Sequence, residues 1–547
     1  MTAAEMTALD RATIEGRGVP SLVLMERAGK GAAREIAAWW REVARPPAAR
    51  RRAPARGAAR GTARRRVADV PRAVILAGRG NNGGDGFVCA RYLKLLGFDP
   101  RVLVAAGAGE LSADAQANHD ACVKARIPVA FFPEAAAWEP GGPAALSAAE
   151  ADVLIDALLG TGSRGAPHGA IARAIDCANH QGEPIVAIDI PSGLDASTGH
   201  LESPSIAATL TTTLALPKRG HVIEPGRSRS GDVRVVDIGI PEDLVEAEAP
   251  GLLFALAGWA RDLLPGRPMD AHKGSMGRAL VVGGSAGMIG AVGMAGESVL
   301  RSGAGYVVAA VPASCLDPLE ARVVEVVKRG LPETPRRTLA GEALEAIVAE
   351  AEQADAIAIG PGLSREPQTE ELVRSLLERL TGPIVLDADG LNAFEKRGVR
   401  YAHGPLIITP HYGEAARISS QTIARVARDP AGWAARYAEE SGAIVCLKST
   451  PMVVAVPGQP VILNTTGNPG MATAGAGDVL TGLIAGFVAQ GLDPGEAAAL
   501  GCFVHGLAGD VASRRMGMRG MIAGDILRAV PAALTALESG ALNEPEA

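Results

Sequence analysis

Ala73-Val74-Ile75-Leu76-Ala77-Gly78-Arg79-Gly80-Asn81-Asn82-Gly83-Gly84-Asp85-Gly86 is the stretch that decides the fold. A short apolar run, Ala73–Ala77, ends in a polar loop rich in glycine, Gly78–Gly86, and a helix-like pattern, Phe87–Leu96, follows it. A buried strand that leads through glycines into a helix presents free backbone N–H groups to a ligand at the carboxyl end of the strand. A structural turn is the alternative. We favour ligand binding, because the loop is long and polar for a simple turn.

Two further apolar runs in this half end in an aspartate. Val153–Ile155 leads into Asp156 and then Gly160-Thr161-Gly162, and Ile185–Ile188 leads into Asp189. An acid at this position faces the same crevice, where it can act as a general acid or base or bind a hard cation. Either aspartate alone fits a helix N-cap equally well. Two of them, together with the Asn/Asp loop, favour a shared site.

A second glycine loop, Ala474-Gly475-Ala476-Gly477-Asp478, leads into a long apolar helix pattern, Val479–Ala489. Such a loop at a helix N-terminus stabilises negative charge, as a transferred phosphate requires. Asp478 begins the helix, where it can take a proton from an attacking hydroxyl. An N-cap aspartate after a flexible loop is the alternative. The glycine density and the preceding Asn468-Pro469-Gly470 turn favour the functional interpretation.

Four other strand-like runs of the second half end in polar turns, at Gly360–Leu363, Asp387–Asn392, Thr409–Glu414 and Lys448–Thr450. Lys448 is suited to meet a phosphate, whereas a single histidine such as His411 is more often structural. Four such strand ends in one domain indicate a crevice.

The chain has 547 residues, too many for one core, and strands alternate with helices in both halves. We therefore predict two α/β domains, each with a parallel sheet. Residues 240–275 are rich in Pro, Gly and acids, with one short helix around Leu253–Leu264. We place the boundary there, with domains at 1–247 and 248–547.

Charge and cysteine usage exclude several classes of protein. The net charge of −6 gives no global attraction to nucleic acid or acidic membranes. The six cysteines are scattered without a Cys-x-x-Cys pair, which speaks against a disulfide framework or zinc site and favours the cytoplasm. No signal peptide or membrane-spanning apolar run is recognised.

One segment, about residues 42–71, is rich in Arg and contains no Lys. We interpret it as a solvated insertion. Binding to nucleic acid or an acidic partner is the alternative, although no aromatic residue in its Arg-rich core supports base stacking.

The first half, over about residues 6–240, resembles the NAD(P)H-hydrate epimerase domain. The motifs that carry the resemblance are Leu9-Asp10, Leu24–Gly29, Gly80–Gly86 with Ala90-Arg91, Asp156–Gly162 and Asp189–Gly193. The resemblance implies a Rossmann-like, doubly wound fold, and inversion of the hydroxyl-bearing carbon of a hydrated nicotinamide ring. Some members also use a lysine, and the matching strand here, Val102–Ala106, contains none.

The resemblance also implies functional residues in this half. Asp156 is the candidate acid/base, and Asn82, Asp156 and Ser192 would hold a potassium ion. The residues implied to contact the substrate are Asn81, Asn82, Gly83, Gly84, Asp85, Gly160, Thr161, Gly162, Ser163, Arg164, Gly165, Ala166 and Asp189.

The second half, over about residues 265–540, resembles the ADP/ATP-dependent NAD(P)H-hydrate dehydratase, which has a ribokinase-like α/β fold. The motifs are His272-Lys273-Gly274, Val281–Ser285, Arg301–Gly305, Gly360–Gly362, Asp387–Asn392, Thr409–Glu414 and Gly467–Asp478. Three positions depart from the family pattern: Tyr412 stands where Pro is usual, Ser449 where Gly is usual and Ala476 where Thr is usual.

The resemblance implies phosphorylation of the hydroxyl by ADP with Mg²⁺, followed by elimination that restores NAD(P)H. Asp478 would be the base. The residues implied to contact the hydrate are Ala291, Gly362, His411 and Asp478, and those implied to contact ADP are Lys448, Ser449, Thr450, Pro451, Met452 and Gly477.

The leading hypothesis is therefore a bifunctional enzyme that repairs hydrated NADH and NADPH, expected to be a cytoplasmic homo-oligomer without membrane or nucleic-acid partners. A ribokinase-type small-molecule kinase with a regulatory first half is the runner-up, favoured by the Gly-Ala-Gly-Asp loop. A non-enzymatic nucleotide-binding or RNA-associated protein is the third hypothesis.

Overall fold

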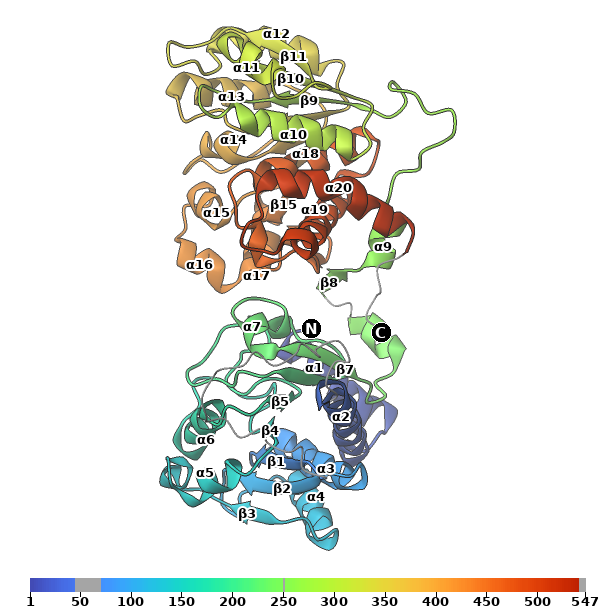
Figure 1. Cartoon of the computed structure of the whole chain (residues 1–547), viewed down its shortest axis with the longest axis vertical. Coiled ribbons are helices and arrows are strands. Elements are labelled where there is room, and N and C mark those ends of the chain that lie inside the picture. The colour runs from blue at the N-terminus through green and yellow to red at the C-terminus, as the bar shows by residue number, and fades with distance from the viewer. Residues whose placement is uncertain (45–69, 249–250, 541–547) are drawn as a thin grey trace, which may run out of the picture. The chain divides into compact units, whose positions relative to one another are not determined.

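The structure of the protein, a computed structural model, describes residues 1–44, 70–248 and 251–540, and Figure 1 shows their helices and strands. The chain forms two compact units, Met1–Pro250 and Gly251–Ala547. The Arg-rich segment expected at about 42–71 lies, apart from its ends, outside the described residues.

The first unit is built on a seven-stranded sheet in which every pairing is parallel. In spatial order its strands are β3 (Val129–Phe131), β2 (Asp99–Val104), β1 (Arg72–Ala77), β4 (Val153–Ala157), β5 (Ile185–Ile188), β6 (Leu210–Leu214) and β7 (Asp232–Val236). The chain winds outward in both directions from the β1–β4 pair. A doubly wound sheet binds its ligands at the carboxyl ends of the strands at such a switch point.

The strand β1 shows why this sequence forms a central strand. Val74 and Leu76 pack into the core on one face of the sheet, whereas Ile75 and Ala77 pack into the core on the other. A strand that is buried on both faces requires a continuous apolar run, which Ala73–Ala77 supplies.

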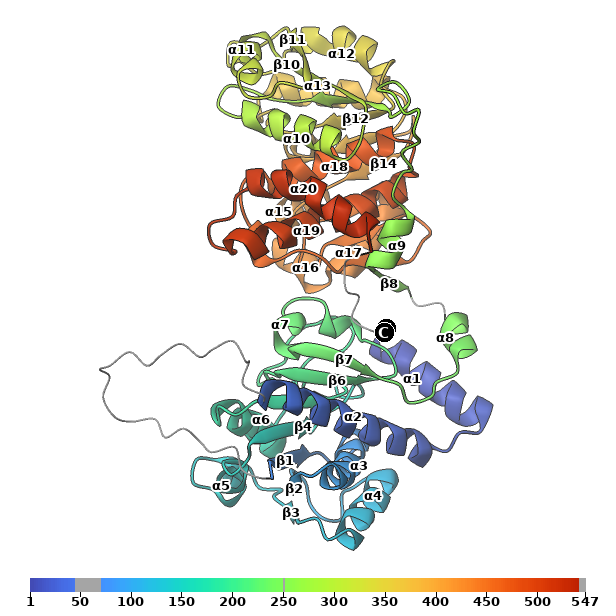
Figure 2. The ribbon, with the colours of Figure 1, turned by 45° about the vertical axis from the view of Figure 1, so that its right-hand side comes forward.

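Helices cover both faces of this sheet. The helices α2, α3 and α4 pack against one another over one face, and α5 and α6 over the other (Figure 2). The helices of the unit are α1 (Ala3–Arg11), the π-helical turn η1 (Ala12–Gly16), α2 (Ser21–Ala44), α3 (Asn81–Leu95), α4 (Ala113–Lys124), α5 (Pro143–Ala148), α6 (Gly169–His180), α7 (Gly226–Ser230) and α8 (Glu242–Glu248), with 3₁₀ turns at Ala135–Trp138 and Arg219–His221.

The second unit has a ten-stranded sheet that is parallel from β11 through β15. The strand β16 pairs antiparallel with both of its neighbours. In spatial order the strands are β11 (Val327–Leu331), β10 (Tyr306–Pro312), β9 (Arg278–Val282), β12 (Ala356–Ile359), β13 (Ile384–Leu386), β14 (Leu406–Ile408), β15 (Ile444–Leu447), β16 (Val453–Ala455), β17 (Val461–Asn464) and β8 (Leu252–Ala255).

The largest core of the second unit lies beneath α10, α18, α19 and α20, which pack together over the sheet (Figure 1). The helices are α9 (Ala257–Asp262), α10 (Ile289–Arg301), α11 (Leu316–Glu320), α12 (Leu344–Ala351), α13 (Pro367–Arg379), α14 (Ala388–Asn392), α15 (Tyr412–Ile418), α16 (Ile423–Arg428), α17 (Pro430–Ser441), α18 (Ala476–Ala489), α19 (Pro494–Met516) and α20 (Ala523–Glu538).

The predicted α/β alternation is confirmed, and the structure differs from the predicted elements in several places, including the short strands β3 and β11, which were not predicted. The polar loop is shorter than expected, because Asn81 already begins α3. The segment Leu253–Leu264 is not one helix but the strand β8 followed by α9. The strand β6 was not predicted, because three consecutive threonines interrupt its apolar pattern, although Thr211, Thr212 and Thr213 are all buried.

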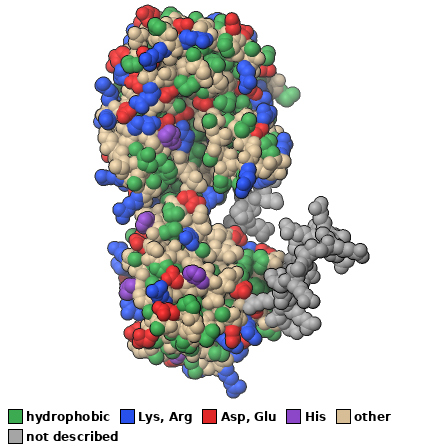
Figure 3. Space-filling view, turned by 60° about the vertical axis from the view of Figure 1, so that its left-hand side comes forward, with side chains coloured by type: hydrophobic (Ala, Val, Ile, Leu, Met, Phe, Trp, Pro, Cys, Tyr) green, Lys and Arg blue, Asp and Glu red, His purple; other side chains and the backbone are tan. Residues whose placement is uncertain are grey.

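Surface and core features agree with the bulk composition. Lys and Arg side chains are interspersed with Asp and Glu over the visible face (Figure 3). All six cysteines are buried and unpaired. Within the described ranges, no helix is long and apolar enough to cross a membrane.

A substitution at Gly78 tests how closely the ends of β1 and β4 pack at the switch point. A Cβ added at Gly78 would lie 1.9 Å from the carbonyl oxygen of Leu158, which directly follows β4. We expect Gly78→Ala to push the ends of β1 and β4 apart and to lower the opening free energy of this region by about 1–3 kcal/mol or more. Hydrogen exchange of the β1 amides measures the effect. Gly109→Ala is the control, because a Cβ there meets no atom within 4 Å. Equal β1 protection in both variants would contradict the packing.

Candidate active sites

A cavity of about 1080 Å³ opens at the carboxyl ends of the strands of the first unit. It is lined by most of the residues that the sequence predicts to contact the substrate. These are Asn81, Asn82, Asp85, Gly160, Thr161, Gly162, Ser163, Arg164, Gly165, Ala166 and Asp189. A cavity of this size, at the switch point of a doubly wound sheet, suits a ligand as large as a dinucleotide.

Gly83 and Gly84 are predicted substrate contacts that do not line the cavity. A Cβ added at Gly83 would lie 2.1 Å from the carbonyl oxygen of Gly78. A Cβ added at Gly84 would lie 2.5 Å from Sδ of Met25. These two glycines therefore allow α3 to pack closely on β1 and α2. The loop serves packing and ligand binding at once.

Asp156, the predicted acid/base, lies at the end of β4 with no exposed surface and does not line the cavity. Its carboxylate accepts hydrogen bonds from the backbone N–H of Leu158 (3.1 Å) and from both the N–H (2.8 Å) and the hydroxyl (2.7 Å) of Ser192. Burial raises the pKa of Asp156 to about 6, although the hydrogen bonds oppose the shift. This position suits a structural or ion-binding carboxylate better than one that exchanges protons with a substrate.

The oxygen atoms around Asp156 fit a potassium ion. The side-chain amide of Asn82 donates to the carbonyl oxygen of Leu159 (2.9 Å), so its Oδ1 faces the other way. That Oδ1 is buried and has no hydrogen-bond partner among the described residues. A buried carbonyl oxygen without a donor is costly unless a cation or water meets it. Asn82, Asp156 and Ser192 together supply only oxygen ligands, as a hard cation requires.

Asp189 differs from Asp156 because it lines the cavity. It receives a hydrogen bond from the backbone N–H of Leu214 (3.3 Å) and an ion pair from Lys218. Lys218 follows the unpredicted strand β6, so the absence of a lysine from Val102–Ala106 does not leave the site without one. The Leu-Pro-Lys sequence that ends at Lys218 carried no signal without the position of β6.

In the second unit, the predicted strand-end residues come together around Asp387, which follows β13. One oxygen of its buried carboxylate receives Nζ of Lys448 (2.7 Å), and the other receives the hydroxyl of Thr481 (2.7 Å). Burial alone would disfavour the charge of Lys448, but Asp387 and Glu414 outweigh this cost and raise its pKa. Lys448 therefore stays a cation. It lies beside the glycine loop, since a Cβ added at Gly477 would lie 3.2 Å from its Nζ.

His411 and Glu414 join this cluster through the N-terminus of α15. The ring Nδ1 of His411 accepts from the backbone N–H of Gly413 (2.9 Å), and the backbone N–H of His411 donates to Glu414 (2.8 Å). His411 thus caps the N-terminus of α15, which is a structural role. About half of its side chain (52%) is nevertheless exposed, so it can also contact a ligand. Burial raises the pKa of Glu414, whose carboxylate lies 3.8 Å from Lys448.

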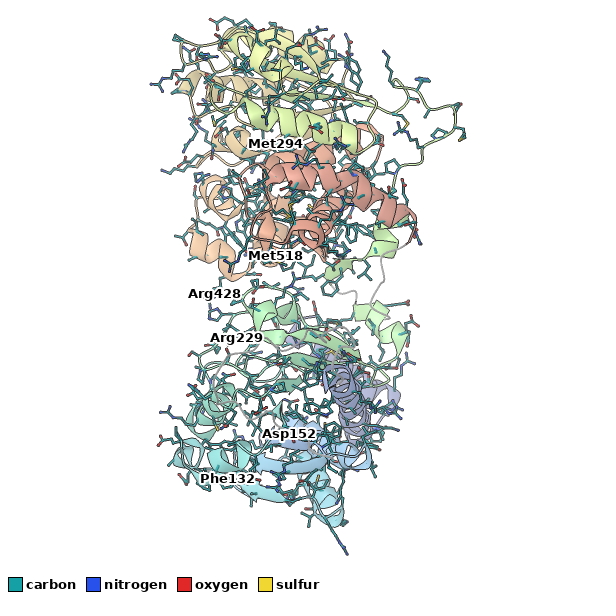
Figure 4. The ribbon with its side chains drawn as sticks, in the orientation of Figure 1. Phe132, Asp152, Arg229, Met294, Arg428 and Met518 are labelled. Atoms are coloured by element: carbon teal, nitrogen blue, oxygen red, sulfur yellow. The ribbon has the colours of Figure 1, made fainter. Side chains whose placement is uncertain are left out.

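The glycine loop ends in an uncapped helix N-terminus. Gly475 adopts a left-handed conformation (φ +90°), and no side chain caps α18. An added Cβ there would meet the side chain of Met294 on α10 at 2.5 Å (Figure 4). Burial, and then the charge of Asp387, raise the pKa of Asp478 to about 7. Asp478 is thus a half-buried carboxyl whose pKa suits a general base near neutral pH.

The remaining predicted residues of this half lie in two groups. Gly362 adjoins Ala291, since a Cβ on the glycine would lie 3.2 Å from that of the alanine. The side chain of Ser449 is held within the segment, because its hydroxyl donates to the carbonyl oxygen of Pro451 (2.7 Å) and lies 3.3 Å from that of Leu447. The segment 448–452 therefore forms a tight turn whose half-buried or exposed members are Lys448, Ser449, Thr450 and Met452.

Comparisons with known proteins match both units. A family model described as YjeF-related protein N-terminus matches residues 21–220, and one described as NAD(P)H-hydrate dehydratase matches residues 279–532. Relatives match nearly the whole chain: the bifunctional NAD(P)H-hydrate repair enzyme of Moorella thermoacetica is 42% identical over 98% of this chain and 97% of its own length.

The chain belongs to the family of bifunctional NAD(P)H-hydrate repair enzymes.

Other members are also similar over most of their length. The enzyme of Salinibacter ruber is 37% identical over 97% of this chain and 95% of its own, and that of Escherichia coli is 34% identical over 83% of each. A crystal structure of ADP/ATP-dependent NAD(P)H-hydrate dehydratase from Bacillus subtilis, with ATP/Mg²⁺, is 28% identical, covers 52% of this chain and 99% of its own, and has a TM-score of 0.47. The predicted fold class, Rossmann-like and then ribokinase-like, is confirmed, and the repair-enzyme assignment replaces the small-molecule kinase.

Replacing Thr481 tests whether its hydrogen bond to the Asp387 carboxylate contributes to the stability of the second unit. Thr481→Val removes the hydroxyl that donates to this buried carboxylate while keeping the shape of the side chain. Because hydrogen bonds to charged groups contribute about 1.5–3 kcal/mol, we expect a loss of that order in the stability of the second unit. Thermal unfolding measures it, and Thr481→Ser, which keeps the hydroxyl, is the control. A valine variant as stable as the serine variant would show that the bond adds nothing.

Proposed function

We propose that the first unit interconverts the R and S forms of hydrated NADH and NADPH, and that the second unit uses ADP to convert the S form back to NAD(P)H. The observation that carries the proposal is the difference between the two sites. The first is a large cavity edged by an oxygen cluster, and the second has Lys448 and Asp478 at an open helix N-terminus. Only the second is built to transfer a phosphoryl group.

In the first site, epimerisation needs no co-substrate. The ring nitrogen of the hydrate expels the hydroxyl on the neighbouring carbon, and water returns to the opposite face of the iminium ion. Asn81 and the Gly160–Ala166 segment hold the substrate, and Asp189 contacts it. Asn82, Asp156 and Ser192 would hold potassium, which when bound neutralises the buried carboxylate at this edge of the cavity.

In the second site, Asp478 takes the proton from the hydroxyl of the hydrate as that oxygen attacks the terminal phosphate of ADP, whose bond to the bridging oxygen breaks to release AMP. The phosphate then leaves with the electrons of the carbon–oxygen bond, and loss of the neighbouring proton restores the dihydronicotinamide. Lys448 and the N-terminus of α18 stabilise the negative charge that develops during the transfer. Ala291, Gly362 and His411 hold the hydrate.

Magnesium fits this site as an ion that arrives with the nucleotide. Among the described residues, no group of three or more His, Cys, Asp or Glu side chains is arranged to hold a metal ion. Mg²⁺ is commonly bound through substrate phosphates with few protein carboxylates, so a dedicated set of ligands is not required.

Pure epimers separate the two activities in one chain. With the S hydrate, ADP and Mg²⁺, recovery of reduced nicotinamide absorbance needs only the second site, whereas the R hydrate needs both. We expect Asp478→Asn to lower recovery from both epimers by about 10²–10⁴-fold, because it removes the base. Asp156→Asn should slow recovery from the R epimer alone, by about 10–100-fold. Full recovery from the S epimer by Asp478→Asn would refute the role of Asp478.

The pKa of Asp478 predicts a pH dependence of the second site. A base must be ionised, and a carboxyl with a pKa of about 7 is increasingly protonated below neutral pH. We therefore expect the rate of recovery from the S epimer to fall about tenfold per pH unit on the acid side of pH 7. Initial rates between pH 5 and pH 9 measure the profile. A rate that stays level down to pH 5 would show that Asp478 is ionised there or is not the base.

A further inference from the structure

Four ionisable side chains from different parts of the first unit meet in its cavity. Asp10 comes from α1, Asp85 from α3, Asp189 from the end of β5, and Lys218 from the segment after β6, and all four line the cavity. The charge of Lys218 acts on all three carboxyl groups, since it contacts Asp189 and partly offsets the rise that burial causes in the pKa values of Asp10 and Asp85.

Lys218 is wholly occupied within the protein. Its side chain is only 1% exposed, and Nζ donates to the carboxylate of Asp189, to the hydroxyl of Thr213 (3.0 Å) and to the carbonyl oxygen of Leu214 (2.8 Å). An ammonium group has three hydrogens to donate, and all three are used. Lys218 therefore has no bond left for a substrate and can act only through Asp189.

Asp189 is held in an unusual backbone conformation. Its φ of +67° lies in the left-handed region, which is unfavourable for a residue other than glycine. The turn that carries Lys218 is fixed from the other side, because the backbone N–H of Lys218 donates to Nδ1 of His221 (3.2 Å). Both partners are thus locked by their surroundings, as a preorganised proton-transfer group requires.

The cation makes Asp189 different from the other two acids. Burial, and then the neighbouring charge of Asp189, raise the pKa of Asp10 to about 6, and the same two causes raise the pKa of Asp85 well above its ordinary range. Asp189 alone is in direct contact with Lys218. Like charges in one buried site cannot all ionise, so the proton-free carboxylate is the one beside the ammonium group.

We propose that Lys218 is a positioning residue of the epimerase site, which holds Asp189 as the ionised base of the reaction while Asp85 supplies the acid. The proposal rests on the epimerase function proposed above and deepens it.

The step balances within the cluster. The carboxyl group of Asp85 gives its proton to the departing hydroxyl, the carbon–oxygen bond breaks to release water, and the lone pair of the ring nitrogen forms the C=N bond of the iminium ion. A water molecule then adds to the opposite face, and its proton goes to the Asp189 carboxylate. Transfer of that proton from Asp189 to Asp85 resets the site. In the reverse reaction the roles exchange: protonated Asp189 gives its proton to the departing hydroxyl, and the Asp85 carboxylate takes the proton of the water that adds.

The test follows inversion of the pure R hydrate of NADH to the S hydrate by NMR spectroscopy, with the full chain and without ADP or ATP, between pH 5 and pH 9, so that the pH dependence of the second site does not enter. The groups that face Asp189 are Asp10, Asp85, Lys218 and His221. Removing the one cation in direct contact makes the ionised form of the base less favourable. In Lys218→Met we therefore expect the acid limb of the R-epimer profile to move to higher pH by about 1–3 pH units. Lys218→Arg, which keeps the charge, should leave the limb within about half a unit of its original position.

Recovery of NADH from the S hydrate, with ADP and Mg²⁺, is the internal control, because it reports the second site of the same molecule and should not change in either variant. Asp189→Asn provides a second check, with inversion of the R hydrate lost at every pH. A Lys218→Met variant that is slower but has an unmoved acid limb would overturn the inference, as would an active Asp189→Asn. A wild-type chain that recovers reduced nicotinamide from the S hydrate but not from the R hydrate would instead overturn the epimerase function itself, and this inference with it.

Discussion

A buried carboxylate at the end of a parallel strand must be compensated, and both units of this protein are organised around that requirement. An ionised group taken out of water without partners would cost many kcal/mol. Asp156 is compensated by hydrogen bonds from Ser192 and Leu158, Asp189 by Lys218, and Asp387 by Lys448 together with a threonine hydroxyl. The parallel sheets bring these partners together, because they place the carboxyl ends of neighbouring strands at one edge.

The kind of compensation determines what each site can do. Asp387 has both oxygens bonded, so it anchors Lys448 beside the glycine loop, and the proton transfer that we propose falls to Asp478. In the first unit, three protein donors and an oxygen cluster surround Asp156, whereas Asp189 keeps a face toward the cavity. In the proposed mechanism, the fully bonded carboxylates Asp156 and Asp387 are therefore distinct from Asp189 and Asp478, which move protons.

Much of the fold was predictable, because buried parallel strands require unbroken apolar runs, and these mark β1, β4, β5 and most strands of the second unit. The same runs located Asp156, Asp189 and the strand-end acids. Lys218 was not predicted as a site residue, because β6 is rich in threonine and was not recognised as a strand. Nothing therefore indicated that the segment after β6 returns to the cavity. The orientation of the two aspartate side chains was not predictable either. The alternation of apolar residues does not reveal that Asp156 is enclosed whereas Asp189 faces the cavity. The cytoplasmic location and the homo-oligomer stay predictions.

The central claim is that two chemically independent sites act on one damaged cofactor, and that only the second needs a phosphoryl donor. The most direct measurement is NMR spectroscopy of the pure R hydrate of NADH mixed with the full chain in the absence of ADP and ATP. The account predicts that signals of the S hydrate grow to their equilibrium level faster than without protein, and that no NADH forms until ADP is added. An R hydrate that inverts no faster than in buffer, or inverts only when nucleotide is present, would contradict it.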